Sequence, residues 1–126
     1  MDIRKKQQAV VAALEDIKAR DIAAFNVTHL TSLFDRVIIA TADSARQAKA
    51  LAVHLHEKLK AMGERVYGVE GESGGDWVLI DLGDIVVHIM QPAVRQYYNL
   101  EELWGEPRPR AKRTRPKSKT AAQPVL

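Results

Sequence analysis

Histidine side chains are the first candidates for metal chemistry in this 126-residue chain, which contains no cysteine. The absence of cysteine excludes disulfides, thiolate metal sites and thiol nucleophiles. His54 and His56 lie two residues apart on a predicted helix, about 200° around its axis, and cannot bind one metal ion together. His29 and His88 have no acidic or histidine partners at the spacing that a zinc site requires. We therefore predict no metal site and no cofactor.

Carboxylates and glycines between residues 71 and 84 suggest two further kinds of site. Asp76, Asp81 and Asp84 are close enough in sequence to suggest Mg²⁺ binding, but Asp84 falls in a predicted turn. A strand would place Asp76 and Asp81 on opposite faces. The segment 73–76 lacks the lysine and the helix that follow a phosphate-binding loop, so we interpret its glycines as turn residues. No G-x-S-x-G motif is present. These observations predict a protein that is not an enzyme.

The aromatic residues point to binding rather than catalysis. Four of the seven lie at Trp77, Tyr97, Tyr98 and Trp104. Trp and Tyr dominate the energetics of protein–protein interfaces, although any one of these four could equally be a core residue. Tyr97 and Tyr98 are adjacent on a predicted helix and point about 100° apart. At least one of them should therefore reach solvent or a partner, and the sequence does not decide which.

A helix and two strands are predicted before residue 42. The helix covers residues 3–19, because apolar residues recur there at a spacing of three and four, and Asp2 suits its N-cap. A strand follows at residues 21–27, then a connection over 28–35. Residues 36–41 are rich in β-branched side chains and predict a buried strand.

A second helix, a short strand and a loop follow. Ser44 and Gln47 have the spacing of a capping box, in which each side chain satisfies an amide at the other position. Gly63 suits the residue after the end of this helix. Residues 66–69 predict a strand and residues 70–76 a glycine-rich loop.

Residues 77–82 and 85–90 are two apolar runs separated by Gly83-Asp84. Glycine at the first central position suits a type II′ hairpin turn. This turn predicts three apolar pairs on one face: Leu82 with Ile85, Ile80 with Val87, and Val78 with Ile89. That face must belong to the core. The other face is mixed and carries Trp77, Leu79 and Asp81 opposite Met90, His88 and Val86.

Two short helical segments are predicted after the hairpin. Pro92 suits the first turn of a helix over residues 93–98, and residues 100–104 form a second piece. The resulting order, α-β-β-α-β-β-β-α, predicts an α/β (α+β) fold in which helices pack on a mixed sheet. Residues 1–105 are predicted to form one domain.

Residues 106–126 differ from the rest in charge. They carry seven of the 19 Lys and Arg residues and one of the 16 Asp and Glu residues, a net charge of +6 against −3 for residues 1–105. Their prolines and alternating basic residues predict a disordered tail. The tail could contact RNA phosphates weakly, or it could be only a solvated extension, because it has no aromatic residues to stack on bases.

The composition is that of a globular protein, with 46% hydrophobic and 28% charged residues. The basic residues at the N-terminus are not followed by an apolar run or a cleavage site, so we expect no secretory signal. No apolar stretch approaches the roughly 18 residues that span a bilayer. Together with the absence of cysteine, these features predict a cytoplasmic protein without membrane contact.

Residues 70–88, EGESGGDWVLIDLGDIVVH, closely resemble the signature of the iojap-like ribosomal silencing factors. Further residues of this family are matched here by Arg95, Tyr98, Leu100-Glu101 and Leu103-Trp104. The resemblance covers about residues 5–105. Three positions depart from the family pattern, namely Asn26 in place of aspartate, Ala42 in place of glycine and Gln47 in place of histidine.

The resemblance implies a nucleotidyltransferase-like fold without the catalytic motif of that superfamily. It also implies a function. Members bind protein fourteen of the large ribosomal subunit, block joining of the small subunit sterically and lower translation when nutrients are scarce. Homodimers are a further expectation. A nucleotide-binding protein of the same fold is the alternative, and the missing paired aspartates speak against it.

The resemblance carries six residues over as contacts to the ribosomal protein: Trp77, Asp81, His88, Arg95, Tyr98 and Trp104. Trp77 and Tyr98 would be apolar anchors, and Asp81 and Arg95 would supply polar or charged contacts. His88 faces Leu79 beside Trp77 in the predicted register and would orient this surface. Trp104 has a structural alternative, in which it closes the last helix onto the sheet.

Overall fold

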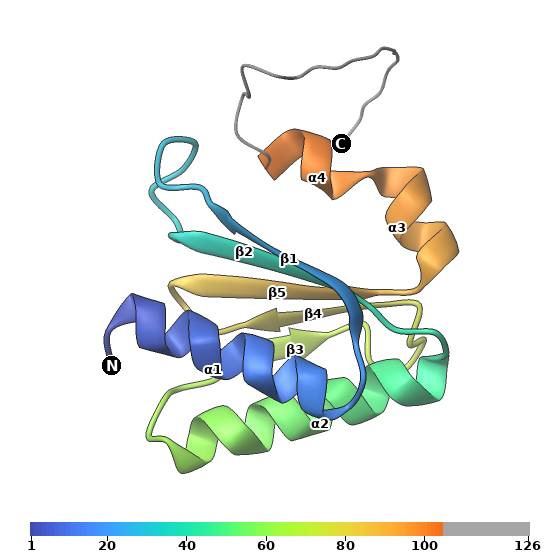
Figure 1. Cartoon of the computed structure of the whole chain (residues 1–126), viewed down its shortest axis with the longest axis horizontal. Coiled ribbons are helices and arrows are strands. Elements are labelled where there is room, and N and C mark those ends of the chain that lie inside the picture. The colour runs from blue at the N-terminus through green and yellow to red at the C-terminus, as the bar shows by residue number, and fades with distance from the viewer. Residues whose placement is uncertain (105–126) are drawn as a thin grey trace.

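The computed structural model describes residues 1–104, which form a five-stranded sheet with helices on both faces (Figure 1). The elements follow the predicted order. Their bounds are α1 (Ile3–Asp16), β1 (Arg20–Asn26), β2 (Arg36–Thr41), α2 (Ala45–Ala61), β3 (Gly68–Glu70), β4 (Trp77–Asp81), β5 (Ile85–Met90), α3 (Pro92–Tyr98) and α4 (Leu100–Trp104). Gly105 and the predicted tail 106–126 lie outside the described residues. None of the helices in residues 1–104 has the length and apolarity needed to cross a membrane.

The sheet is mixed, and its strand order is β1-β2-β5-β4-β3. β2 and β5 run parallel at its centre, whereas the other neighbouring strands are antiparallel. Pairing between β2 and β5 joins segments that α2, β3 and β4 separate in the chain, so local sequence patterns do not reveal it. The mixed sheet with packed helices confirms the predicted α+β fold.

α1 and α2 cover one face of the sheet and form the larger of two apolar cores there (Figure 1). The predicted apolar face of the hairpin points into this core. Its register is the predicted one, with Val78 opposite Ile89 and Ile80 opposite Val87. Gly83 has a φ of +90°, whereas Asp84 has no positive φ, as a type II′ turn requires.

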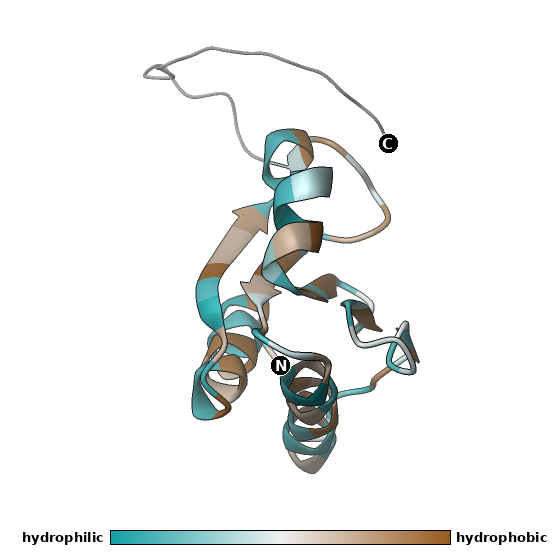
Figure 2. Cartoon of the chain, turned by 90° about the vertical axis from the view of Figure 1, so that its right-hand side faces the viewer, coloured by the Kyte–Doolittle hydropathy of each residue, from teal (hydrophilic) through white to brown (hydrophobic). Residues whose placement is uncertain are grey.

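α3 and α4 cover part of the opposite face, where a smaller core forms (Figure 2). Its buried members are Val27, Val37, Ile39, Met90 and Leu100. Trp77 and Trp104 are partly buried and pack against it. The mixed face of the hairpin is therefore less open than its sequence suggests, because His88 and Met90 are buried in it.

Two element boundaries differ from the prediction by two residues or more. α1 ends at Asp16 rather than at residue 19, because Lys18 adopts a φ of +65° and turns the chain toward β1. β3 begins at Gly68, two residues later than predicted. The backbone of Tyr67 still bonds to Asp81 of β4 at 2.8 Å, so the chain already follows the sheet edge there.

The start of α2 differs in one hydrogen bond from the predicted capping box. The backbone N–H of Gln47 donates to Ser44 Oγ at 3.0 Å, as predicted. Gln47 Oε1 accepts from the backbone of Asp43 at 2.7 Å, rather than from Ser44. Gln47 Nε2 donates to the carbonyls of Ile17 and Lys18, at 2.9 and 3.1 Å. Gln47 therefore joins the start of α2 to the end of α1.

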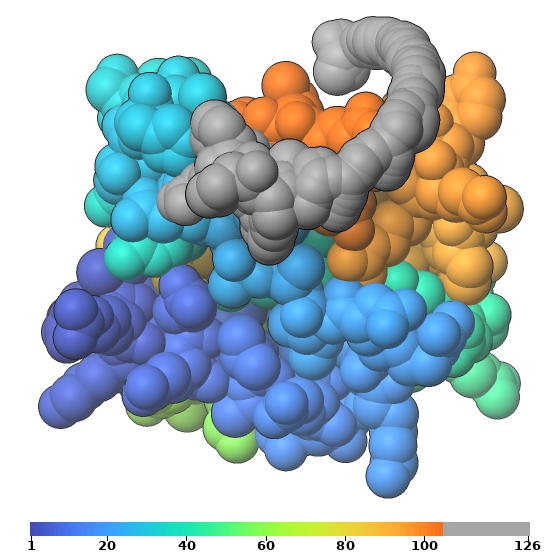
Figure 3. Space-filling model, turned by 45° about the horizontal axis from the view of Figure 1, so that its top comes forward, coloured from blue at the N-terminus to red at the C-terminus, as the bar shows by residue number. Residues whose placement is uncertain are grey.

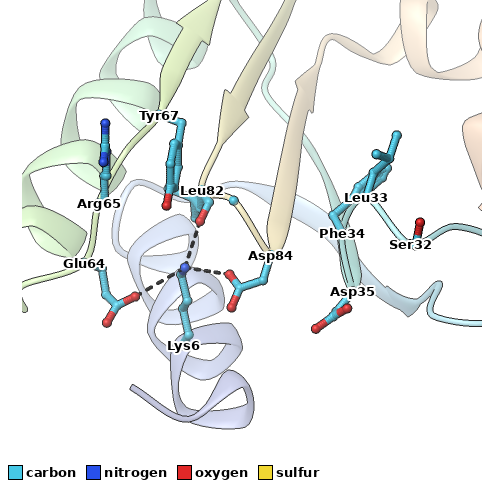
Figure 4. Close-up of a pocket in the computed structure, with 11 residues that line it drawn as sticks. Lys6, Ser32, Leu33, Phe34, Asp35, Glu64, Arg65, Tyr67, Leu82 and Asp84 are labelled. Atoms are coloured by element: carbon cyan, nitrogen blue, oxygen red, sulfur yellow. Dashed lines mark hydrogen bonds and ion pairs between the residues drawn. The ribbon is translucent and has the colours of Figure 1, made fainter.

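Lys6 is a buried charge that the apolar spacing of α1 does not predict. Its Nζ donates to the Leu82 carbonyl at 2.9 Å and to Asp84 at 2.6 Å, and lies 3.3 Å from Glu64 (Figure 4). Burial acts to lower the pKa of Lys6, but Asp84 and Glu64 outweigh it and the pKa is raised. Lys6 thus ties α1 to the hairpin turn and to the connection after α2.

The turn at Gly83 provides a test of the hairpin. A Cβ at this residue would lie 2.8 Å from Tyr67 Cε1, in addition to the strain of the positive φ. Gly83→Ala should therefore lower the free energy of unfolding by about 1–2 kcal/mol, measured by urea denaturation. Gly68→Ala is the control, because nothing lies within 4 Å of its Cβ position. Equal stability of the two variants would contradict the turn geometry.

Candidate protein-binding surface

Trp77, Tyr97 and Tyr98 form a continuous aromatic cluster, named here the aromatic surface. The rings of Trp77 and Tyr98 have their centroids 4.8 Å apart, and those of Tyr97 and Tyr98 are 5.0 Å apart in an edge-to-face arrangement. Tyr97 is 81% exposed and Tyr98 50%. Tyr98 is thus the tyrosine that contacts Trp77, and both tyrosines reach solvent. In the space-filling view, α3 lies at the opposite side of the molecule from the β1–β2 loop (Figure 3).

Residues at the two ends of α3 determine where these rings lie. Pro92 begins α3, and Asn99 ends it with a left-handed φ of +49°. Gln91 precedes the helix and donates from its backbone to Asp76 and from its side chain to Gly75, both at 2.9 Å. The glycine-rich loop therefore supports the start of α3, in line with its interpretation as a turn.

His88 lies beneath Trp77 and is only 7% exposed. Its Nδ1 accepts a hydrogen bond from Trp77 Nε1 at 3.0 Å. Burial lowers the pKa of His88 to about 4, so the ring is neutral at physiological pH. Because Nδ1 is the acceptor, the ring proton resides on Nε2. The predicted orienting role of His88 thus has a geometric basis, in a bond to Trp77.

Two of the predicted contact residues lie apart from the aromatic surface. Asp81 is at the other end of β4 from Trp77, about 13 Å away along an extended strand. Its Oδ1 accepts from the Gly83 amide at 2.8 Å and supports the hairpin turn. Trp104 packs edge-to-face on Phe34, with centroids 5.6 Å apart, as in its structural alternative. Its Nε1 is buried and has no hydrogen-bond partner among the described residues.

Arg95 points from α3 back into the protein, and its side chain is 13% exposed. Its Nε and Nη2 bind Glu101 at 2.7 and 2.6 Å. Its Nη1 donates to the Asp21 carbonyl at 2.6 Å and to Thr41 Oγ1 at 2.8 Å. These bonds are all internal, whereas the sequence suggested a contact to a partner.

A hollow of about 510 Å³ lies at the other end of the sheet and bears on the nucleotide-binding alternative (Figure 4). The lysine and the arginine that line this hollow already contact other residues of the protein. Lys6 binds Leu82, Asp84 and Glu64, and the Arg65 guanidinium lies 4.8 Å from the centre of the Tyr67 ring. Three carboxylates also line the hollow, and they would repel a phosphate. Within residues 1–104 no group of three His, Asp or Glu could hold a metal ion.

Comparison with known families gives a match over nearly the whole chain. The family model described as "Ribosomal silencing factor during starvation" matches residues 1–125. The chain belongs to this family. The family predicted from residues 70–104 is thereby confirmed, and it is a family of ribosome-silencing regulators rather than of known enzymes.

Individual relatives of this silencing-factor chain agree with the assignment. A ribosomal silencing factor of Chromobacterium violaceum is 51% identical over 86% of this chain and 89% of its own length. A crystal structure of a C. violaceum protein, also 51% identical, superposes with a TM-score of 0.82 and covers 86% of this chain and 91% of its own. A mouse protein named for mitochondrial assembly of the large ribosomal subunit is 32% identical over 75% of this chain and 43% of its own length.

The buried His88 predicts an acid-dependent loss of stability. Its pKa is about 4 when folded and near 6.5 when unfolded, so the unfolded chain binds more protons between these values. The free energy of unfolding should fall by about 3 kcal/mol as pH drops from 6.5 to 4. Urea denaturation at pH 7, 5.5 and 4.5 measures it.

His88→Asn is the matched variant, because its amide oxygen can replace Nδ1 as acceptor but does not titrate. The free energy of unfolding of this variant should not show the fall between pH 6.5 and 4. The pKa values of Asp16 and Asp43 are lowered below their ordinary value of 3.8, through hydrogen bonds from His54 and Arg20. The stability that these two carboxylates contribute is therefore lost only at a lower pH than that lost through His88. An identical pH dependence of wild type and variant would show that His88 is not the group responsible.

Proposed function

We propose that this protein binds protein fourteen of the large ribosomal subunit through the aromatic surface and thereby prevents the small subunit from joining. In the cytoplasm this would lower translation when nutrients are scarce. Family membership supports a role on the ribosome. The steric mechanism needs only a stable complex at the subunit interface, so it requires no catalytic group.

The exposure of Tyr97 and Tyr98 is the observation that carries the choice of surface. Aromatic side chains bury a large area on binding and lose little conformational entropy, since each has only two rotatable bonds. Here the rings already contact one another and Trp77, which reduces that entropy further. An exposed cluster of aromatic rings in mutual contact is therefore suited to be the centre of a protein interface.

The six predicted contact residues take different roles in this proposal. Trp77 and Tyr98 are the anchors, and Tyr97 extends them outward. His88 acts beneath Trp77, through the indole hydrogen bond. Asp81 can touch the partner only if the interface extends along the hairpin to its turn. Trp104 and Arg95 have their main contacts inside the protein.

Tyr98→Ala should weaken binding to isolated large subunits, because it removes one anchor and leaves Trp77 without its neighbour. Loss of an anchor costs about 2–4 kcal/mol, or roughly 30- to 1,000-fold in affinity. Sedimentation of the protein with separated large and small subunits measures this. Trp77→Glu is a less specific test, because Trp77 also packs against the smaller core. The substitution would therefore destabilise the fold as well as the surface.

Tyr67→Ala is the matched control, because Tyr67 is 58% exposed but precedes β3, away from α3. It should sediment with large subunits as the wild type does. Wild-type levels of Tyr98→Ala in the large-subunit fraction would overturn the assignment of the surface.

The basic segment 106–126 is proposed to add only weak contacts to ribosomal RNA. Replacement of its seven Lys and Arg residues by Gln in the full chain should lower affinity a few-fold at low salt and little at high salt. Affinity measured across a KCl series distinguishes the two contributions. If this variant loses binding at every salt concentration while Tyr98→Ala binds normally, RNA contacts rather than the aromatic surface are primary.

A further inference from the structure

α3 carries both exposed tyrosines, yet none of its seven residues is buried. A helix of two turns is not stable by itself in water, because nucleation costs more than so few hydrogen bonds return. The apolar contacts of α3 are few, namely the partly buried Val94 and the packing of Tyr98 on Trp77. The position of Tyr97 and Tyr98 therefore depends in large part on polar contacts between α3 and the rest of the protein.

Arg95 supplies the most extensive of these contacts. From the middle of α3 its guanidinium reaches the Asp21 carbonyl on β1, Thr41 Oγ1 on β2 and the Glu101 carboxylate on α4. Three of the five guanidinium N–H donors make hydrogen bonds inside the protein, and Nη2 forms the ion pair with Glu101, so little of the group is left for a partner. We infer that Arg95 is a positioning residue, which holds α3 and α4 on the sheet and so presents the aromatic surface.

The sheet edge has an irregular backbone at the point where Arg95 binds. Arg20 pairs with Thr41 and Ala23 with Ile39, so Asp21 and Ile22 together face a single residue of β2. This is a β-bulge, and Asp21 within it has a φ of +50°, an unfavourable conformation for a residue with a side chain. The Asp21 carbonyl in this bulge accepts from Arg95. Arg95 therefore binds a carbonyl at the point where the β1 backbone departs from regular pairing with β2.

The ion pair between Arg95 and Glu101 fixes the corner between α3 and α4. Asn99 turns the chain, Leu100 is buried in the smaller core, and Glu101 follows at the start of α4. The Arg95–Glu101 ion pair closes this corner, so that α3 cannot rotate independently of α4. Rigid presentation lowers the entropy cost of binding, which is how a residue without partner contact can raise affinity.

This inference rests on the proposed function, and Glu101 separates it from a direct contact. Arg95→Lys keeps the charge but cannot reach three acceptors, and Glu101→Gln breaks the ion pair without changing Arg95. Both variants should weaken binding to isolated large subunits about tenfold, and the double variant should be no weaker than either. The slope of affinity against KCl concentration should stay that of the wild type. Arg65→Lys, at the other end of the sheet, is the control and should bind normally.

A direct contact between Arg95 and the ribosomal protein predicts the opposite results for these variants. Glu101→Gln would then bind as well as the wild type or better, because it releases Arg95, and Arg95→Lys would alter the salt dependence. Either result overturns the inference. A measurement without any partner is also available: nuclear Overhauser contacts between the Tyr98 ring and the Trp77 indole should weaken in Arg95→Lys while those between α1 and α2 persist. Unchanged contacts would likewise overturn it, whereas absence of wild-type binding would refute only the proposed function.

Discussion

The parallel pairing of β2 and β5 is the constraint on which the rest of the structure depends. All residues of β2 except Arg36, and all of β5 except Val86, are buried. Strands that are buried on both faces need a cover on both faces. α1 and α2 provide one cover and are large and apolar. The other cover comes from Val27 and Phe34, before β2, and from the chain after β5, where the described residues form only two short helices.

The two short helices divide this task between them. α4 is held by apolar contacts through Leu100 and Trp104. α3 spans the end of the sheet with little burial, and the contacts of Arg95 and Gln91 keep it there. A helix held by polar contacts can leave its aromatic side chains outside. This arrangement explains how a small domain keeps two tyrosines in solvent without folding them into its core.

Much of the fold could be predicted because its signals are local. The hairpin register follows from alternation around Gly83, and the ends of α2 follow from Ser44 and Gly63. The strand order could not be predicted, because it depends on pairing between segments far apart in the chain. The family could be identified from residues 70–104, since a long motif is specific even without a structure.

The candidate site was predicted in part. Trp77 and Tyr98 are neighbours, as expected from the resemblance, but which tyrosine meets Trp77 depends on how α3 docks. The burial of His88 and the internal contacts of Arg95 were not visible in the sequence. A histidine on a mixed strand face and an arginine on a short helix look like surface residues, and only tertiary contacts with Trp77, Asp21 and Thr41 show otherwise.

The central strand pair also has a consequence for how the chain folds during synthesis. β2 cannot complete its pairing until β5 has been made, and α2, β3 and β4 lie between them in the chain. Closing such a long loop is slow relative to forming a helix or a hairpin. The nascent chain must therefore leave the edge of β2 that pairs with β5 open until residue 90 has left the exit tunnel. During that interval the β-branched segment 36–41 has an unpaired strand edge, which makes it prone to aggregate.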